Sequence, residues 1–373
     1  MVKRFFQMSK VNPISSFESN LLASLIQKTI ELRGSQYPNP AVGAMVIKNN
    51  HVISEGFHLL YGHDHAEVVA LKKAGSSAQG ATLLITLEPC VHTGKTPPCV
   101  NAIINAGIQR VIWAINDPNP RVYGKAQMIL EDKSIEVIPH YSPDAGLACL
   151  KEFHAYHQYD RPYVYVKAAV SLDGKIAPHS NGLTYISSPE SLHVVQQLRQ
   201  NVQAICVGAS TINIDQPRLS IRIDQRNDFQ PLIVILDPNN SVDLNWVHKT
   251  LGLGREILLF RSESMPSEMD GLTVLSNLTS DKQQNWQLVM KTLYEKKIHG
   301  LLVEGGSAVF RSILNAGYFD ELWITKVPQV FGSDAVPFVS NGANLPLDIS
   351  LTSSEIYGSD VVMKYQNNHA FSV

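Results

Sequence analysis

The first 115 residues alternate between helical and strand patterns, and this order constrains the fold most strongly. Apolar residues recur every three or four positions over 16–33, which predicts an amphipathic helix that Gly34 ends. Two strand patterns, at 42–47 and 52–56, are joined across Asn49-Asn50, a pair that tolerates the positive φ of a hairpin turn. Helix and strand patterns then alternate at 66–74, 82–87, 99–106 and 110–115. This order predicts a mixed sheet covered by helices, with sites at the carboxyl ends of its strands.

The length of 373 residues predicts two domains, because domains average about 150 residues. A stretch at 139–162 rich in His, Tyr and Asp predicts a short connecting helix at 143–155 and a boundary near Asp160. We therefore expect a leader at 1–15, one domain at 16–159 and another at 160–373. The second domain has strand patterns at 163–170, 204–207, 232–236, 257–260 and 301–303, with helices at 189–200 and 307–315. These patterns predict a second α/β unit.

Charge and hydropathy exclude several classes of protein. The 31 Lys and Arg residues nearly balance 33 Asp and Glu, so no basic footprint for nucleic acid is present. No apolar run approaches the roughly 20 residues that cross a bilayer, and no apolar segment follows the basic first ten residues. Four cysteines are too few for a disulfide scaffold. We expect a cytoplasmic protein without a nucleic-acid or membrane partner.

The first domain contains a set of residues with the chemistry of a zinc site. His65, Cys90 and Cys99 supply one imidazole and two thiolates, which fill three tetrahedral positions and leave the fourth open for water. His65 and Cys99 both stand at predicted helix starts, where the helix dipole favours a thiolate. Glu67 lies on the same first helical turn as His65 and can exchange protons with the water and the leaving amine. The pattern therefore predicts a catalytic zinc site.

Each of these residues also has a simpler interpretation when it is taken alone. A buried cysteine usually packs as a small hydrophobe, and an isolated histidine is usually a surface or core residue. The combination nevertheless matches the His-x-Glu and Pro-Cys-x-x-Cys signature of zinc nucleobase deaminases, except that eight residues separate Cys90 from Cys99. Cys149 and Cys206 lack such neighbours, and we expect them to pack in the core.

The segment between Cys90 and Cys99 is rich in groups that bind anions or hydroxyls. It contains the ammonium of Lys95, the hydroxyl of Thr96 and the flexible backbone at Gly94. Because both ends are tied to expected ligands, the loop predicts contact with a phosphorylated substrate. The alternative is an ordinary polar surface loop.

These motifs resemble the deaminase half of the bifunctional riboflavin-biosynthesis deaminase/reductase family. The matching segments are 38–43 (PNPAVG), 56–58 (GFH), 65–67 (HAE), 86–90 (TLEPC), 92–99 (HTGKTPPC) and 117–120 (DPNP). The resemblance implies a cytidine-deaminase-like three-layer domain that hydrolyses the 2-amino group of a phosphoribosylated diaminopyrimidinone. It implies Glu67 as the proton shuttle, His65, Cys90 and Cys99 as zinc ligands, and Asn39, His58, His92, Lys95, Thr96, Asp117 and Asn119 as substrate contacts.

The second domain lacks a Gly-x-Gly-x-x-Gly fingerprint, and its three notable segments are individually weak signals. They are 167–175, 208–219 and the Gly-Gly turn within 303–307, whose following helix start can hold a phosphate. Together they resemble the reductase half of the same family, so the resemblance extends over about 16–365. It implies a dihydrofolate-reductase-like α/β domain that uses NADPH to reduce the ribosyl group to a ribityl chain.

The resemblance also implies roles for individual residues of this domain. Ala169, Tyr185, Thr211, Asp215 and the segment 306–312, which includes Gly306 and Ser307, would lie along the cofactor. The residues that would face the substrate are Lys167, Arg199, Leu219, Arg222 and Glu304. Arg199 and Arg222 suit a phosphate because guanidinium groups bind it through two hydrogen bonds.

Three positions depart from the family pattern. Tyr185 stands where Trp is usual, Leu183 where a substrate-binding Ser is usual, and Gln216 where a second Asp is usual. A tyrosine still stacks on a ring, whereas Leu183 removes a hydroxyl from a polar site and so costs about 1 kcal/mol or more. An enzyme with deaminase activity and an impaired reductase domain therefore stays open as an alternative.

Two further alternatives remain. One is a deaminase of free nucleosides or transfer RNA, which the long gap between the cysteines, the Lys95-Thr96 pair and the near-neutral charge oppose. The other is a non-catalytic binding module stabilised by metal, which would have no need of Glu67. Enzymes of this class are often symmetric oligomers, but the sequence leaves open whether the chain forms a homo-oligomer.

Overall fold

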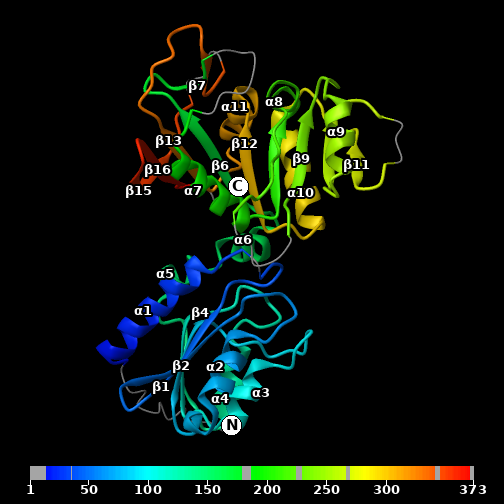
Figure 1. The fold of residues 1–373 in the computed structure, drawn as a ribbon. Helices are drawn as coiled ribbons and strands as arrows, with labels where there is room; N and C mark the ends of the chain where they lie inside the picture. The colour runs from blue at the N-terminus through cyan, green and yellow to red at the C-terminus, as the bar shows by residue number, and fades with distance from the viewer. Residues whose placement is uncertain are drawn as a thin grey trace, which may run out of the picture. The chain divides into compact units, whose positions relative to one another are not determined.

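The computed structural model describes residues 14–34, 36–178, 186–223, 229–265, 269–340 and 345–369. By its contacts the chain divides into two compact units, residues 1–158 and 159–373 (Figure 1). Within the described residues no helix has the length and apolarity to cross a membrane. The expected leader lies mostly outside these residues. The last residue of the expected leader, Ser15, caps the first helix, because its side chain and Glu18 form a capping box.

The sheet of the first unit confirms the predicted hairpin and the predicted mixed pairing. Asn49 and Asn50 both adopt positive φ, at 52° and 58°, in the hairpin turn. The order across the sheet is β2 (His51–Phe57), β1 (Gly43–Lys48), β3 (Thr82–Leu87), β4 (Arg110–Ile115) and β5 (Glu136–Ile138). Strand β1 is antiparallel to both of its neighbours, whereas β3 with β4 and β4 with β5 pair in parallel.

Helices cover both faces of this sheet, so the predicted three-layer arrangement is confirmed. On one face α1 (Ser16–Glu31) packs through Leu22 and Leu25 against Met45 and Leu84. The opposite face carries α2 (Ala66–Ala74), α3 (Cys99–Asn105) and α4 (Lys125–Asp132), and a short 3₁₀ helix (Gly75–Ala78) follows α2. The α2 and α3 helices carry His65 and Cys99 at their starts, which brings the two residues to one end of the sheet.

The single helix expected at 143–155 is wrong, because the chain forms two helices there. They are α5 (Pro143–Leu147) and α6 (Lys151–Tyr159). The interruption buries Cys149 and Leu150, each 1% exposed, in two hydrophobic clusters of the first unit.

The second unit is built on a larger sheet, most of it parallel. The order across this sheet is β11 (Leu272–Leu275), β10 (Ile257–Arg261), β9 (Leu232–Asp237), β8 (Ala204–Gly208), β12 (Gly300–Gly305), β6 (Tyr163–Val170), β13 (Glu321–Lys326), β16 (Asp360–Asn367) and β15 (Ile349–Tyr357). In this order the first seven strands run in parallel, and β16 and β15 add an antiparallel hairpin at one edge. A separate pair is formed by β14 (Val336–Pro337) and β7 (Lys175–Ala177).

Two helices bury their apolar faces on one side of this sheet. Trp286 of α10 (Lys282–Glu295) and Phe310 of α11 (Ser307–Ala316) pack over Cys206, Val234 and Val303. Cys206 and Cys149 therefore both lie in cores, as predicted. The remaining helices are α7 (Pro189–Asn201), α8 (Ala209–Asp215) and α9 (Leu244–Leu251). The notable segment 208–219 follows β8, and α8 occupies most of it.

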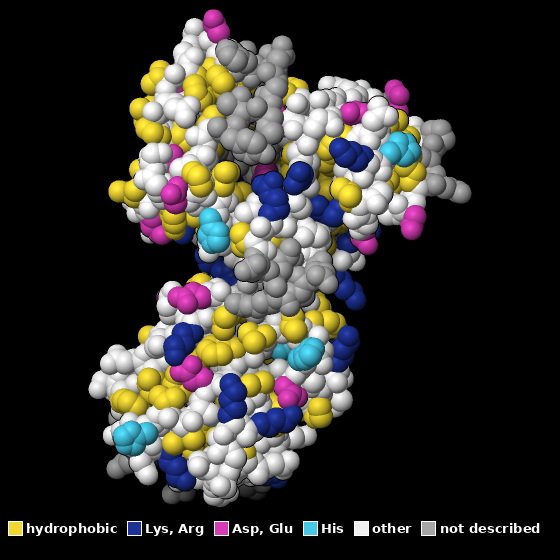
Figure 2. Space-filling model, viewed as in Figure 1, with side chains coloured by type: hydrophobic (Ala, Val, Ile, Leu, Met, Phe, Trp, Pro, Cys, Tyr) yellow, Lys and Arg dark blue, Asp and Glu magenta, His cyan; other side chains and the backbone are white. Residues whose placement is uncertain are grey.

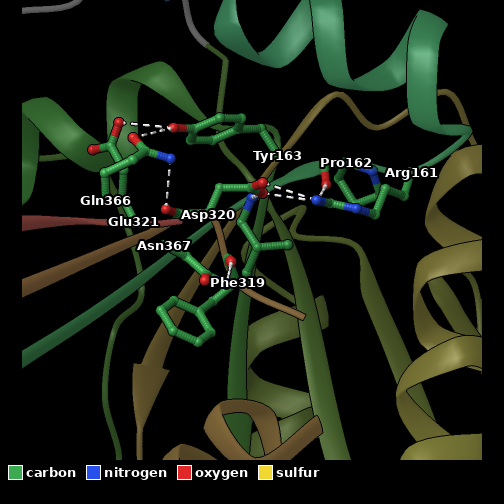
Figure 3. A network of polar contacts seen from close by, with 9 residues as sticks. Arg161, Pro162, Tyr163, Phe319, Asp320, Glu321, Gln366 and Asn367 are labelled. Carbon is green, nitrogen blue, oxygen red and sulfur yellow. Dashed lines mark hydrogen bonds and ion pairs between the residues drawn. The ribbon is translucent and has the colours of Figure 1, made fainter. Parts of the chain in front are cut away.

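A buried ion pair ties the start of β6 to the start of β13 (Figure 3). Arg161 donates two hydrogen bonds, of 2.7 and 2.8 Å, to the two carboxylate oxygens of Asp320. Asp320 is fully buried and also accepts the backbone N–H of Val164 at 2.7 Å. Because each partner satisfies the other in a buried site, removing one charge leaves the second uncompensated.

We expect Asp320→Asn to lower the free energy of unfolding of the second unit by about 3 kcal/mol, because Arg161 then stays buried without a counter-ion. Urea unfolding of the full chain measures this loss. The matched control is Glu355→Gln, which removes a surface pair with Lys364 and should change stability by less than about 1 kcal/mol. Equal effects of the two variants would contradict a stabilising role for the buried pair.

Candidate functional site

Three side chains from separate elements converge at the carboxyl end of β3. His65 precedes α2, Cys99 begins α3, and Cys90 follows β3. The Nδ1 atom of His65 lies 3.6 Å from the Cys90 Sγ and 3.3 Å from the Cys99 Sγ. Tetrahedral Zn²⁺ with ordinary bond lengths would separate such nitrogen and sulfur ligands by about 3.5 Å. The cluster predicted from the sequence therefore fits zinc.

Neighbouring polar groups hold two of these ligands in place. The other ring nitrogen of His65, Nε2, lies 3.4 Å from the hydroxyl of Thr96, and the backbone N–H of Cys99 donates to the Cys90 Sγ at 3.3 Å. A hydrogen bond at the far nitrogen fixes the tautomer and orientation of a ligating histidine. Thr96 therefore contacts a metal ligand, which the sequence did not predict.

Glu67 lies beside this cluster in a cavity of about 150 Å³. Its side chain is 3% exposed, and burial raises its pKa to about 7. A carboxyl group that gains and loses a proton near neutrality suits general acid–base chemistry. Glu67 belongs to no ligand triplet, so it is placed for proton transfer next to the metal rather than for binding it.

The structure brings five of the seven expected substrate contacts to this cavity. They are Asn39, His58, His92, Asp117 and Asn119. Neither Thr96 nor Lys95 is among the described residues that line it. The ammonium of Lys95 instead lies 4.1 Å from the ring centroid of Tyr61, in a cation–π contact.

His58 and Asn39 form a connected pair at the cavity wall. The Nδ1 of His58 lies 3.1 Å from the backbone carbonyl of Asp64, and its Nε2 lies 3.1 Å from the Nδ2 of Asn39. A proton on Nδ1 donates to the carbonyl and leaves Nε2 to accept from the Asn39 amide. Burial lowers the pKa of His58, which favours this neutral form.

Sequence reasoning missed several residues that line this cavity, among them Glu88 and Phe153. The buried carboxylate of Glu88 accepts three backbone N–H groups, those of Asp117, Gly124 and Ala126, at 3.0 to 3.2 Å. Glu88 thereby holds the loop that presents Asp117. The sequence feature that could have identified Glu88 is an acidic residue between a largely apolar strand and Cys90, where burial requires hydrogen-bond partners.

A second cavity, of about 660 Å³, lies in the second unit at the carboxyl ends of β6, β8 and β12. Every described residue that the family resemblance assigned to the substrate lines it, as do most of those assigned to the cofactor. These are Lys167, Arg199, Leu219, Arg222, Glu304, Ala169, Thr211, Asp215 and Gly306. Ser307 does not line it, and the departures at Leu183 and Tyr185 lie outside the described residues.

The charged groups of this cavity are arranged around Glu304. Arg199 donates from Nε and Nη2 to both carboxylate oxygens of Glu304, at 2.6 and 2.5 Å, and from Nη1 to the carbonyl of Ser220 at 3.0 Å. Two of the nitrogens that Arg199 would offer to a phosphate are thus bound to Glu304, and the expected phosphate contact of Arg199 stays a prediction. Arg222 is exposed at the rim of the cavity.

The pKa values of Lys167 and Glu304 are both lowered, but for different reasons. Burial lowers the pKa of Lys167 to about 8, although the charge of Glu304 opposes this. Burial also disfavours the charged form of Glu304, but the positive charges of Arg199 and Lys167 outweigh it and lower the pKa of Glu304. At neutral pH the cavity therefore contains a protonated lysine beside a carboxylate.

Two polar groups bear on cofactor binding in the second unit. Ser307 begins α11, and its buried Oγ has no hydrogen-bond partner among the described residues, as expected where a phosphate oxygen binds. The departing residue Gln216 lies at the cavity wall in a left-handed conformation, and its amide donates to Asp243 at 3.0 Å. The Ser307 hydroxyl fits a dinucleotide diphosphate at this helix start.

The fold and the two cavities define an enzyme with a zinc-dependent deaminase unit and a reductase unit. Comparison with known families agrees: residues 19–115 match the cytidine and deoxycytidylate deaminase zinc-binding region, and residues 162–363 match the RibD C-terminal domain. The chain belongs to the RibD family of riboflavin biosynthesis proteins. It is a bifunctional deaminase and reductase that uses zinc and NADPH, and the resemblance found in the sequence is confirmed.

Individual relatives match most of the chain. The riboflavin biosynthesis protein RibD of Aquifex aeolicus is 36% identical over 322 residues, which are 86% of this chain and 89% of the relative. The RibD of Bacillus amyloliquefaciens is 39% identical over 83% of this chain and 84% of its own. Among solved structures, Acinetobacter baumannii RibD is 30% identical, with a TM-score of 0.82, and covers 93% of this chain and 99% of its own.

Proposed function

We propose that the chain hydrolyses 2,5-diamino-6-(5-phosphoribosylamino)pyrimidin-4-one to 5-amino-6-(5-phosphoribosylamino)uracil and ammonia, and then reduces the ribosyl group of this product. A Thermotoga maritima relative, 30% identical and with a TM-score of 0.81 over 93% of this chain and 99% of its own, is named a diaminohydroxyphosphoribosylaminopyrimidine deaminase/5-amino-6-(5-phosphoribosylamino)uracil reductase. The main support for the proposal is the position of Glu67, which is buried in the same cavity as the predicted zinc ligands.

In the deaminase cavity, Glu67 moves protons between water and the leaving group. His65, Cys90 and Cys99 would hold Zn²⁺, which when bound lowers the pKa of water toward neutrality. Glu67 takes one proton from the attacking water as the oxygen bonds to C2 of the pyrimidine. It returns this proton to the amino nitrogen as the carbon–nitrogen bond breaks, so that ammonia leaves.

Polar side chains of the same cavity orient the pyrimidine ring. The Asn39 amide, fixed through His58, and the carboxyl group of Asp117 suit the donor and acceptor edge of the ring. Burial raises the pKa of Asp117 to about 7, so this group both donates and accepts hydrogen bonds near neutrality. Asn119 donates its backbone N–H to Asp117 at 2.8 Å and thereby positions it. His92 contacts the substrate from the loop that precedes Cys99.

In the reductase cavity, Lys167 acts as the proton donor. Ala169, Thr211, Asp215, Gly306 and Ser307 would hold NADPH, which when bound supplies the hydride that C1′ of the ribosyl group requires. As the bond between C1′ and O4′ opens, the ammonium of Lys167 gives its proton to O4′, which completes the ribityl chain. Glu304 holds Lys167 in its protonated form. Arg222, at the rim of the cavity, would bind the phosphate of the substrate. Leu219 lines the same cavity and would contact the substrate there.

Two signals from one protein test the proposal. Zinc-loaded full-length protein is given the diaminopyrimidinone, and ammonia release and NADPH oxidation are measured with and without a chelator. We expect both signals, with the first lost on chelation. NADPH oxidation should persist under chelation when the uracil intermediate is supplied. Ammonia release without NADPH oxidation would instead support the alternative of an impaired reductase.

We expect Thr96→Val to weaken zinc binding about tenfold, because the hydroxyl beside His65 Nε2 helps to orient a metal ligand. Valine keeps the shape of the side chain and removes only the hydrogen bond. Zinc affinity is measured by competition with a chelator of known strength. The control is Thr93→Val, an exposed threonine of the same loop. Equal zinc affinity of the two variants would argue that Thr96 has another role.

We also propose that the partners of the chain are small molecules and that it acts in the cytoplasm. None of the four cysteines, all of which lie in the described residues, forms a disulfide, which suits a reducing compartment. Figure 2 shows basic and acidic side chains interspersed on the face in view, which favours small-molecule over nucleic-acid binding. Light scattering of the purified protein would determine whether it forms a symmetric homo-oligomer.

A further inference from the structure

The second unit contains another cavity, of about 200 Å³, beyond the carboxyl ends of β8 and β9. Much of its wall is apolar and comes from Leu236, Leu278, Trp286, Val289 and Val309. Such a slot between apolar side chains suits a flat aromatic ring. Among the described residues that line it, Lys282 is the only lysine or arginine.

This cavity adjoins the reductase cavity across the start of α11. Gly306 lines the reductase cavity, Ala308 and Val309 line this one, and the unpartnered hydroxyl of Ser307 lies between them in the chain. A dinucleotide is two nucleosides joined by a diphosphate, and a helix start can hold the diphosphate. If NADPH binds in the reductase cavity, as proposed above, its adenosine half therefore reaches the apolar cavity.

The carboxylate of Asp237 and the amide of Asn285, both at the cavity wall, are already engaged. Asp237 is fully buried, accepts the backbone N–H groups of Ser241 and Val242, and pairs with Arg261 at 3.3 Å. The side chain of Asn285 bonds to the backbone of Thr279 at both of its polar atoms. The carboxylate of Asp237 therefore stabilises the loop after β9. It is not available to bind the two ribose hydroxyls, as an acidic residue does in sites that select NADH.

We propose that Lys282 selects NADPH over NADH by binding the 2′-phosphate of the adenosine ribose. Lys282 is exposed and is the first residue of α10, where the helix dipole also favours an anion. The neighbouring Asp281 uses its carboxylate to cap α10, with bonds of 2.8 and 3.2 Å to Gln283 and Gln284. The ammonium of Lys282 has no hydrogen bond or ion pair within the described residues, so it is available to a phosphate.

Two adenosine nucleotides that differ only in the 2′-phosphate test this role without turnover. Zinc-loaded full-length protein is titrated calorimetrically with adenosine 2′,5′-bisphosphate and with 5′-AMP. We expect Lys282→Gln to weaken the bisphosphate about tenfold and to leave 5′-AMP unchanged, and Lys282→Arg to restore most of the affinity. The control is Lys291→Gln, an exposed lysine of α10 outside the cavity wall. Steady-state kinetics should show the matching rise in KM for NADPH but not for NADH.

Several outcomes would overturn the proposal, and they differ from failure of the reductase assignment. Equal weakening of both nucleotides by Lys282→Gln would show that the lysine supports the fold or the adenosine itself. Unchanged bisphosphate affinity would show that another group selects the phosphate. In both cases the wild-type protein would still oxidise NADPH with the uracil substrate. Absence of that oxidation would instead refute the reductase assignment on which the proposal rests.

Discussion

Glu67→Gln should abolish ammonia release, with a loss of about a thousandfold, while the protein keeps its zinc. The amide has nearly the shape of the carboxylate, but it cannot take a proton from water or return one to the leaving amine. The three ligand side chains remain, so metal content should equal that of the wild type. Ammonia release and zinc content are measured on the same preparation.

Two controls separate proton transfer from other effects of this substitution. Glu55→Gln removes a carboxylate that pairs with Lys28 on the surface, and it should leave deamination unchanged. The Glu67 variant should still oxidise NADPH at the wild-type rate when the uracil intermediate is supplied, because the reductase cavity lies in the other unit. Loss of zinc together with activity would show that Glu67 maintains the metal site rather than moving protons.

Most elements with a strong periodic pattern were predicted from the sequence. The helix at 66–74 and the strands at 82–87, 110–115 and 163–170 agree with the structure at both ends. In each of these strands nearly every side chain is buried, so local hydropathy and tertiary packing give the same answer. The mixed sheet and the three layers follow from the order of these elements.

The elements that were missed have weaker local signals. The β15–β16 hairpin lies at the sheet edge, and most residues of β15 are exposed, so its sequence lacks a buried face. In α10, four polar residues precede Trp286, so the apolar positions that pack on the sheet are hard to recognise in the sequence. The short α8 follows a glycine, a feature that indicates a turn as readily as a helix start.

Candidate site residues were easier to predict than their contacts. His65, Cys90 and Cys99 could be found because zinc chemistry restricts the ligand types and their spacing. The pairing of Arg199 with Glu304 joins residues 105 positions apart, and only the fold brings them together. Lys95 and Thr96 lie in the expected loop, but whether a loop side chain faces a cavity depends on backbone geometry that composition does not determine.

Lys167→Met should lower the rate of NADPH oxidation by about a hundredfold or more and leave ammonia release unchanged. Methionine retains the length and apolar contacts of the side chain but has no proton to give to O4′. The rate is measured with the uracil intermediate and saturating NADPH. Lys249→Met, at an exposed position of α9, serves as the control and should match the wild type.

The pH dependence of the reductase separates proton donation from simple charge attraction. Burial lowers the pKa of Lys167 to about 8, so the ammonium is present below this pH and is lost as the pH rises through it. The wild-type kcat should therefore be flat below pH 8 and fall above it. Lys167→Arg keeps a positive charge at all these pH values but is a poor acid, so its kcat should be low and should not fall near pH 8. A wild-type profile that stays flat through this range, or an arginine variant with wild-type kcat, would show that Lys167 only positions the substrate.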